Sequence, residues 1–281
     1  MKRITLIIMV AITSHSFAQR NMEIAQDYKL ELEEDGIVVE VFDSTNIDDS
    51  RYNKNNVIFR EGVSFHYKFE HIDKNNEQRY IEYIDSLAHW NFIPVRDFNK
   101  NTIKQVNITV EKGLQGFGKR FPDYNQTIIA YTYPTQGDYV GSIRSSSGVI
   151  ENEGNIWMHP PRDNYFEILE LNPFPYIKAP YQIGTKWTWS LKIGDYWADG
   201  RWKLWKGTIQ NEYQYEIVDY KTLNVKLGPL DCYVIEAIAT SSIGETQLRA
   251  YFNETYGFVR LEYINIDGSK TNLELINFLG S

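Results

Sequence analysis

The stretch Lys186-Trp187-Thr188-Trp189-Ser190-Leu191-Lys192-Ile193 alternates strictly between polar and large apolar side chains. A period of two places all of the apolar side chains on one face of an extended strand, whereas a helix would scatter them around its axis. Trp187 and Trp189 therefore share the face that turns toward a core. The stretch predicts a β-strand with one buried face and one solvated face, which is typical of antiparallel sheets.

The same alternation recurs along most of the chain, and turn residues separate the alternating runs. The further strand candidates are residues 36–42, 57–59, 64–69, 106–110, 127–133, 212–220, 232–239, 246–252, 257–266 and 272–278. Asp267-Gly268 between the last two suits a hairpin turn, because both residues tolerate positive φ. We therefore predict a mainly β fold, an antiparallel curved sheet or an incomplete barrel, with few helices.

One segment has apolar residues at intervals of three and four, as a helix does. They are Tyr80, Ile81, Ile84, Leu87 and Ala88. Asn75-Asn76 could cap such a helix. The same residues could instead form the second arm of a hairpin that turns at residues 73–76, and both readings stay open.

The first eighteen residues have the pattern of a secretory signal peptide. Lys2-Arg3 precedes an apolar run from Ile4 to Ile12, and Ser16-Phe17-Ala18 precedes Gln19. We expect an exported mature chain in the periplasm, at the cell surface or outside the cell. No later stretch approaches the roughly 20 apolar residues that a membrane helix needs, so no membrane span is expected. Cys232 is the single cysteine, which argues against a lipidated N-terminal cysteine and against an internal disulfide.

Two regions are predicted on either side of residue 150. Polar and glycine-rich sequence interrupts the strand pattern over residues 142–155, and prolines cluster over residues 160–180. We predict an N-terminal β-rich region of unknown role at 19–150 and a C-terminal antiparallel β domain at 151–281. Because proline lacks an amide hydrogen, the proline cluster is interpreted as an extended connector that wraps the second region.

The mature chain is acidic, mostly because of its N-terminal segment. Without Lys2 and Arg3, 27 basic residues face 37 acidic ones, a formal net charge of −10. Ten of the acids lie between Gln19 and Ser50, against Arg20 and Lys29. A protein that binds nucleic acid or anionic lipid by charge needs a basic face, so neither partner is expected. The segment lacks the ligand spacing of a calcium loop, and no metal or cofactor is predicted.

Catalytic signatures are nearly absent from the sequence. It contains no His-Glu-x-x-His zinc motif and no Gly-x-Ser-x-Gly elbow. His159-Pro160-Pro161-Arg162-Asp163 joins a base, a cation and a carboxylate on a backbone that two prolines stiffen. His159 with Asp163 could perform acid and base chemistry, although no nucleophile lies at matching spacing. No residue is assigned as catalytic, and His159, Arg162 and Asp163 remain a further candidate group.

Aromatic residues give the densest chemical signal, since five of the seven tryptophans fall within residues 187–205. Tryptophan can fill a β core, stack on a sugar ring or line an apolar pocket. Core filling suits Trp187 and Trp189, which share a strand face. Tyr196 and Trp197 stand beside carboxylates in a predicted loop, and together with Trp202 they suit a ligand-facing rim. The hypothetical ligand-binding residues are Trp187, Trp189, Tyr196, Trp197, Trp202 and Trp205.

Three stretches resemble a group of uncharacterised exported bacterial proteins. They are residues 184–189 (Gly-Thr-Lys-Trp-Thr-Trp), residues 227–237 (from Leu-Gly-Pro-Leu-Asp-Cys onward) and residues 251–261 (which include Gly-Phe-Val). The resemblance covers residues 181–278. It implies a fold similar to the periplasmic lipoprotein carriers, with a curved antiparallel sheet around an apolar concavity, and it supplies no catalytic residues.

Three functions are compatible with these observations. The first is a non-enzymatic binding protein whose sheet holds an apolar or amphipathic envelope ligand such as a lipid. The second is a module that binds a glycan, or assembles with an envelope protein partner, through exposed Trp and Tyr rings. The third is a hydrolase with an unrecognised site. The depth of the tryptophans should separate the first two, because rings around an enclosed cavity favour lipid and coplanar rings on a rim favour sugar.

Overall fold

The computed structural model describes residues 28–84, 89–116, 120–121, 124–136 and 144–280, so the predicted signal peptide lies outside the described residues. The strands are β1 (Tyr28–Leu32), β2 (Val38–Phe42), β3 (Ser64–Ile72), β4 (Gln78–Ile84), β5 (His89–Pro94), β6 (Thr102–Ile103), β7 (Gln105–Val110), β8 (Thr127–Thr132), β9 (Arg144–Glu151), β10 (Asn155–Met158), β11 (Tyr176–Lys178), β12 (Lys186–Gly194), β13 (Thr208–Val225), β14 (Gly228–Ser241), β15 (Gly244–Asn253), β16 (Gly257–Ile264) and β17 (Lys270–Leu279). The 3₁₀ helices are η2 (Val95–Asp97), η3 (Asn164–Leu171) and η4 (Asp195–Trp197).

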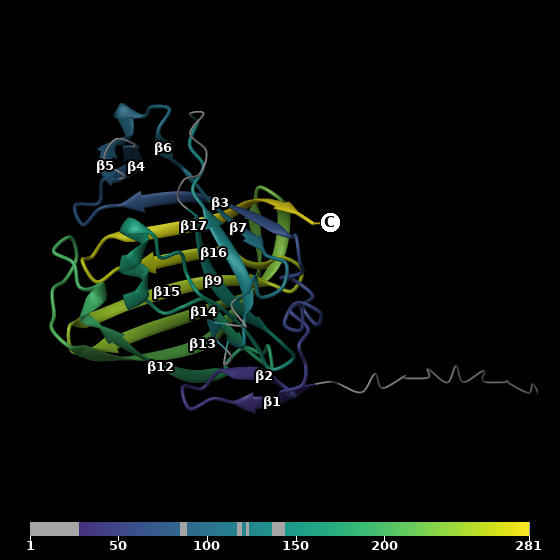
Figure 1. Ribbon diagram of the computed structural model, residues 1–281. Coiled ribbons are helices and arrows are strands. Elements are labelled where there is room, and N and C mark those ends of the chain that lie inside the picture. Colours follow the sequence, from purple (N-terminus) through teal and green to yellow (C-terminus); the bar gives the residue numbers. More distant parts are fainter. Residues whose placement is uncertain (1–27, 85–88, 117–119, 122–123, 137–143, 281) are drawn as a thin grey trace, which may run out of the picture.

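Strands β3 to β17 form one sheet of 15 strands, and β1 and β2 form a separate hairpin. In the large sheet β12 to β17 make an antiparallel meander, β17 pairs with β3, β3 pairs with β7, and the order continues from β7 through β8, β9 and β10 to β11. The sheet curls into a nearly closed barrel-like shape, with β4, β5 and β6 at one end and β1 and β2 at the other (Figure 1). The prediction of a mainly β fold with a curved antiparallel sheet is confirmed.

The sheet runs across the boundary predicted at residues 150 and 151. These two residues are consecutive in β9, which pairs with β8 on one side and β10 on the other. Strand β3, from the first predicted region, pairs with β17, the last strand of the second, from Ser64 to Ile72. The two regions therefore share one set of backbone hydrogen bonds.

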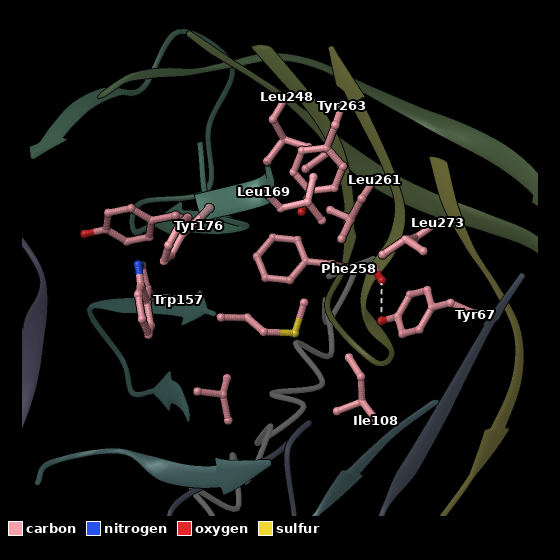
Figure 2. Packing of buried hydrophobic residues seen from close by; sticks show 14 of the residues in the cluster. Tyr67, Ile108, Trp157, Leu169, Tyr176, Leu248, Phe258, Leu261, Tyr263 and Leu273 are labelled. Carbon is pink, nitrogen blue, oxygen red and sulfur yellow. Dashed lines mark hydrogen bonds between the residues drawn. The ribbon is translucent and has the colours of Figure 1, made fainter. Parts of the chain in front are cut away.

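Aromatic and aliphatic side chains fill the interior of the sheet. Figure 2 shows Leu261 and Phe258 facing Trp157 across the interior, with Leu169 of η3 between the walls. The Tyr67 hydroxyl donates a hydrogen bond of 2.8 Å to the Phe258 carbonyl. Each fully buried large side chain contributes roughly 1.5–3 kcal/mol to the free energy of unfolding. The apolar concavity that the resemblance implies is thus occupied by side chains of the chain itself.

The segment with the helical spacing is strand β4, so its helix interpretation is wrong and its hairpin interpretation is confirmed. The Asp73 carboxylate accepts hydrogen bonds from the amides of Asn75 and Glu77, at 2.9 and 3.0 Å, and Asn76 takes φ of 67°. Such an Asx turn reverses the chain after β3. The hydrogen bonds of this turn, rather than the spacing of the apolar residues, therefore decide the local structure. Leu87 and Ala88, the last two residues of the predicted helix pattern, lie outside the described residues.

The predicted strand at residues 57–59 is wrong, because one buried carboxylate binds all three of its amides. The Glu151 side chain accepts hydrogen bonds from the amides of Val57, Ile58 and Phe59 at 2.8–3.2 Å. Amides that converge on one carboxylate cannot also serve a strand ladder, whose donors point alternately to both sides. Burial raises the pKa of Glu151, and the three amides oppose that rise.

The proline-rich segment does not wrap the outside as predicted. Its middle part is η3, which lies inside the sheet with Phe166, Ile168 and Leu169 fully buried. Only its end forms a strand, the three-residue edge strand β11. Prolines therefore exclude central strands here, as expected, but the apolar residues between them are drawn into the core.

The two end strands of the sheet, β11 and β12, do not pair with each other, and the β1–β2 turn fills the seam between them. The Gly36 carbonyl accepts hydrogen bonds from the Tyr176 hydroxyl (3.0 Å) and from Lys178 Nζ (3.3 Å) of β11. A Cβ on Gly36, which has φ of +100°, would lie 2.9 Å from the Thr188 carbonyl oxygen of β12. Asn155 of β10 also attaches the β1–β2 hairpin to the large sheet, because its side chain forms hydrogen bonds with both the amide and the carbonyl of Val38.

Candidate functional site

The outward side chains of β12 to β17 form two rows that cross the strands. Successive cross-strand partners in the first, the outer row, are Thr188, Gln214, Ile238, Gln247, Ile264 and Lys270. In the second, the charged row, they are Lys186, Glu216, Glu236, Arg249, Glu262 and Asn272. Neighbouring strands lie about 4.8 Å apart, so each row spans about 24 Å.

The two rows line a hollow of about 1090 Å³, which we call the outer hollow. Ile72 of β3 and Val218 of β13 also line it. Ile238 and Ile264 are 42% and 41% exposed there, although both belong to regular strands of a well-packed sheet. Gln247 lies between them, on the strand that separates theirs. The centre of the hollow therefore combines apolar surface with a side-chain amide.

The charged side chains that line the hollow balance in sign, and the ion pairs among them are weak because they are exposed. Lys186, Arg249 and Lys270 oppose Glu216, Glu236 and Glu262. Lys186 Nζ lies 3.1 Å from Glu216, and Arg249 Nε donates to Glu236 at 3.1 Å. The Glu236 bond, more than any other contact, raises the pKa of Arg249. Exposed pairs of this kind contribute about 0–1 kcal/mol, so a ligand can replace them at small cost.

Trp187 and Trp189 lie on the opposite, inner face of β12. Trp187 stacks on Tyr215 with ring centroids 5.2 Å apart and planes 6° apart, and Trp189 stacks on Tyr213 at 4.6 Å and 17°. Both indoles are buried. Trp187 nevertheless contributes to the lining of the outer hollow. It lies on β12 between Lys186 and Thr188, which belong to the two outward rows.

The remaining predicted aromatic residues lie around η4. Tyr196 is 84% exposed, and its ring stands at 86° to that of Trp197. Trp202 is buried and donates its indole N–H to the Trp197 carbonyl at 3.1 Å, while the Arg201 guanidinium lies over its ring. Trp205 is partly buried against the core. The structure thus gathers Tyr196, Trp197 and Trp202 in one loop, but Trp197 is partly buried against the core and its ring is perpendicular rather than coplanar to that of Tyr196.

His159 lies inside the sheet, and its nearest carboxylate is that of Glu170 rather than Asp163. His159 Nε2 is 3.3 Å from Glu170 Oε1, and His159 Nδ1 is 2.8 Å from the Pro160 carbonyl. Since a carbonyl only accepts, Nδ1 carries the proton and Nε2 is the acceptor. Burial, with help from Arg162, lowers the pKa of His159 to about 3, and burial raises that of Glu170 to about 8. The contact has ion-pair distance, but burial favours the uncharged form of both groups.

Arg162 and Asp163 form hydrogen bonds with other residues and not with His159. Asp163 accepts hydrogen bonds from the hydroxyls of Tyr133 and Ser145, and Arg162 donates to the Ser146 carbonyl at 3.2 Å. Burial and the Asp163 charge hold the pKa of Tyr133 well above its usual range. His159, Arg162 and Asp163 therefore share a neighbourhood without forming the acid and base pair that the sequence suggested.

Sequence reasoning missed both the outer hollow and Glu170. The residues of the two rows alternate correctly along each strand, but only the register places Ile238 beside Gln247 and Gln247 beside Ile264. Glu170 carried a detectable signal, since it is the lone acid within Ile168-Leu169-Glu170-Leu171. A carboxylate in such a run needs a partner when it is buried.

Within the described part of the chain, no three His, Cys, Asp or Glu side chains gather in a way that could hold a metal ion. No helix in the described ranges has the length and hydropathy needed to cross a membrane.

The chain matches no family model and no curated protein. Among solved structures it is similar to a candidate exported protein with a YmcC-like fold from Bacteroides fragilis NCTC 9343, with 11% identity and a TM-score of 0.44 over 79% of this chain and 97% of that one. A candidate lipoprotein from Parabacteroides distasonis ATCC 8503 gives 11% and 0.44, over 80% and 100%. The hypothetical lipoprotein YmcC from Escherichia coli K12 gives 12% and 0.33, over 81% and 90%.

Proposed function

We propose that this chain is an exported binding protein that holds an amphipathic ligand in the outer hollow. The observation that carries the proposal is the pair of exposed isoleucines, Ile238 and Ile264, at the centre of a hollow of about 1090 Å³. A volume of this order suits a ligand larger than most drug-sized molecules. Export is inferred from the signal-peptide pattern of residues 1–18.

The ligand class follows from the lining of the hollow. The isoleucines supply apolar contact for a hydrocarbon chain, and Gln214 and Gln247 supply amide hydrogen bonds. Three cations and three anions in the lining favour a neutral or zwitterionic head group over one with a net charge. A single-chain zwitterionic lipid meets all three requirements.

Native mass spectrometry tests the proposal directly. Residues 19–281 are mixed with lysophosphatidylcholine below its micelle concentration, and lysophosphatidylglycerol serves as the anionic comparison. We expect a one-to-one adduct with the zwitterionic lipid that Ile238→Asp abolishes, because a carboxylate would be buried against the acyl chain. An adduct that Ile238→Asp leaves unchanged, or no adduct with either lipid, contradicts the proposal.

A glycan is the second candidate ligand, because Tyr196 presents an almost fully exposed ring next to Trp197. Sugars stack best on a flat aromatic face, and the perpendicular arrangement of these two rings offers one face rather than a platform. Glycan-array screening of the same chain with Trp197→Ala tests this candidate. A glycan whose binding survives this substitution would not be held by the rings of this loop.

A further inference from the structure

The loop that joins β12 to β13 presents two large apolar side chains to solvent. Tyr196 is 84% exposed and Leu204 is 70% exposed. Single exposed apolar residues are common on soluble proteins, but here two lie within one short loop. No residue of this loop lines the outer hollow, so the loop is a separate surface. We call residues 195–207 the aromatic loop, because they also include Trp197, Trp202 and Trp205.

Hydrogen bonds fold the aromatic loop back on itself. The backbones of Asp199 and Lys203 exchange two hydrogen bonds, of 3.0 and 2.9 Å. The Gly207 amide donates to the Asp195 carboxylate at 2.8 Å. The two arms of the loop therefore run side by side in opposite directions, and the two exposed apolar side chains lie on neighbouring arms.

Contacts with the rest of the molecule hold the loop in place. Trp202 is buried beneath it and donates its indole N–H to the Trp197 carbonyl at 3.1 Å. Arg201 donates to Asp199 at 3.0 Å and to the Asn164 side chain of η3 at 3.1 Å. A surface that is fixed before binding loses less entropy when a partner arrives. The exposed apolar side chains are thus held ready for contact.

The free charges of the aromatic loop are positive. Lys203 and Lys206 are exposed and form no ion pair within the described ranges of the chain. Of the two acids, Asp199 is bonded by Arg201, which lowers the pKa of Asp199 below its usual value, and Asp195 accepts a backbone amide of the loop. The acids that dominate the net charge of the mature chain belong to its N-terminal segment and not to this loop.

This combination of side chains matches the surface of a lipid bilayer. Tyrosine rings are favoured at the level of the head groups, where the ring is in apolar surroundings and the hydroxyl meets water. Lysine stems lie along apolar surface while the ammonium groups reach the phosphates. A sugar is a poorer match, because Leu204 offers no ring face and the rings of Tyr196 and Trp197 are perpendicular.

We propose that the aromatic loop docks the protein on a bilayer surface that contains anionic lipids, with Tyr196 and Leu204 in the interface and Lys203 and Lys206 against the phosphates. The contact is peripheral and reversible, because binding strength follows the small apolar area and the few charges involved. The total charge of the chain, which predicted no binding to anionic lipid, matters less here, because physiological salt screens charges farther than about 8 Å from the bilayer.

Vesicle flotation with residues 19–281 tests the proposal. One vesicle preparation is phosphatidylcholine alone, and the other is an equal mixture of phosphatidylcholine and phosphatidylglycerol. We expect about tenfold stronger binding to the mixed vesicles, since each lysine near an anionic surface adds to the attraction. High salt should remove this difference. No binding to the mixed vesicles, or equal binding to both preparations, overturns the proposal.

Two double variants assign the binding to the loop. Tyr196→Ser with Leu204→Ser should weaken binding to the mixed vesicles about tenfold, because the apolar contact is lost. Lys203→Gln with Lys206→Gln should remove the preference for the anionic mixture. Thermal unfolding confirms that both variants are folded. Flotation that neither double variant changes would place the contact elsewhere and refute the assignment.

Matched controls lie at the other end of the same two strands. Ile183→Ser replaces a 63% exposed apolar residue just before β12, and Lys226→Gln replaces an exposed lysine just after β13. Neither should change vesicle binding. Ile238→Asp should abolish lysophosphatidylcholine binding in the outer hollow and leave flotation intact, because the proposal does not rest on the ligand of the hollow. Loss of flotation in a folded Ile238→Asp variant would show that vesicles are bound through the hollow, against the proposal.

Discussion

The inner and outer faces of strands β12 to β17 differ in almost every physical respect. The inner face carries stacked aromatic pairs such as Trp189 on Tyr213 and packs against η3 and Trp157. The outer face carries amides, balanced charges and the exposed Ile238 and Ile264, around a hollow of about 1090 Å³. The same backbone therefore supports a filled core on one side and an open surface on the other.

The buried tryptophans of the inner face, the most conspicuous residues of the sequence, stabilise the fold. A cluster of tryptophans attracts attention as a binding site, but burial of the inner pair leaves no ring surface for a ligand. Ordinary residues on the alternate positions form the hollow. The comparison predicts that inner-face changes alter stability and that outer-face changes alter binding.

The largest effect is expected for Trp189→Ala. Loss of a buried ring that contacts Tyr213, Phe174 and Trp157 should lower the free energy of unfolding by about 3–5 kcal/mol. Trp189→Phe should cost less than half as much, because the Trp189 indole N–H has no hydrogen-bond partner within the described part of the chain. Urea denaturation measures both. Equal losses for the two variants would show that ring stacking does not hold this face together.

The next effect is expected at the seam that closes the inner space. Gly36→Ala should cost about 2–4 kcal/mol, because the new Cβ meets the Thr188 carbonyl at 2.9 Å and φ is positive. Gly184→Ala is the matched control, with φ of +90° and no atom within 4 Å of its Cβ, and should cost about 1–2 kcal/mol. Thermal unfolding compares them. If the two variants are equally stable, the β1–β2 turn does not press on β12.

A pH effect of intermediate size should come from the interior pair. Folding raises the pKa of Glu170 from 4.5 to about 8, so the folded state keeps a proton that the unfolded chain has lost, and stability falls as pH rises toward 8. Folding lowers the pKa of His159 from 6.5 to about 3, so stability rises with pH between these values. Between pH 4.5 and 6.5 the two contributions oppose each other. From pH 6.5 to 8 only the Glu170 contribution of this pair changes, and it lowers the free energy of unfolding by up to about 1.4 kcal/mol per pH unit.

Glu170→Gln isolates that contribution. The variant should keep the rise of stability at low pH and lose the fall above pH 6.5, as measured by urea denaturation across this range. Glu167, whose pKa burial also raises, is a neighbouring carboxylate, and Glu167→Gln serves as the comparison. A fall above pH 6.5 that persists in Glu170→Gln would assign it to another group.

The smallest effect on stability, and the largest on binding, is expected for Ile238→Asp. Ile238 is 42% exposed on a regular strand, so the free energy of unfolding should change by about 1 kcal/mol or less. Binding of lysophosphatidylcholine should be lost. Thr240→Asn, also exposed on β14 but outside the hollow, should leave both quantities nearly unchanged.

The sequence predicted the strands better than the site, for physical reasons. Alternation identifies β12 and the buried faces of Trp187 and Trp189, because burial on one face of a strand follows directly from a period of two. It could not find the Glu151 clamp, since the amides of residues 57–59 and their acceptor are more than 90 residues apart. The outer hollow depends on register across six strands, and no local pattern encodes which isoleucine faces which glutamine.

NMR mapping of lysophosphatidylcholine binding tests the central claim most directly. The account predicts that backbone amides of Gln214, Ile238, Gln247 and Ile264 shift on titration, while the indole N–H signals of Trp157 and Trp189 stay fixed. Shifts of those two indole signals would place the ligand inside the sheet and contradict the account. A titration that moves no signal of the outer row would contradict it equally.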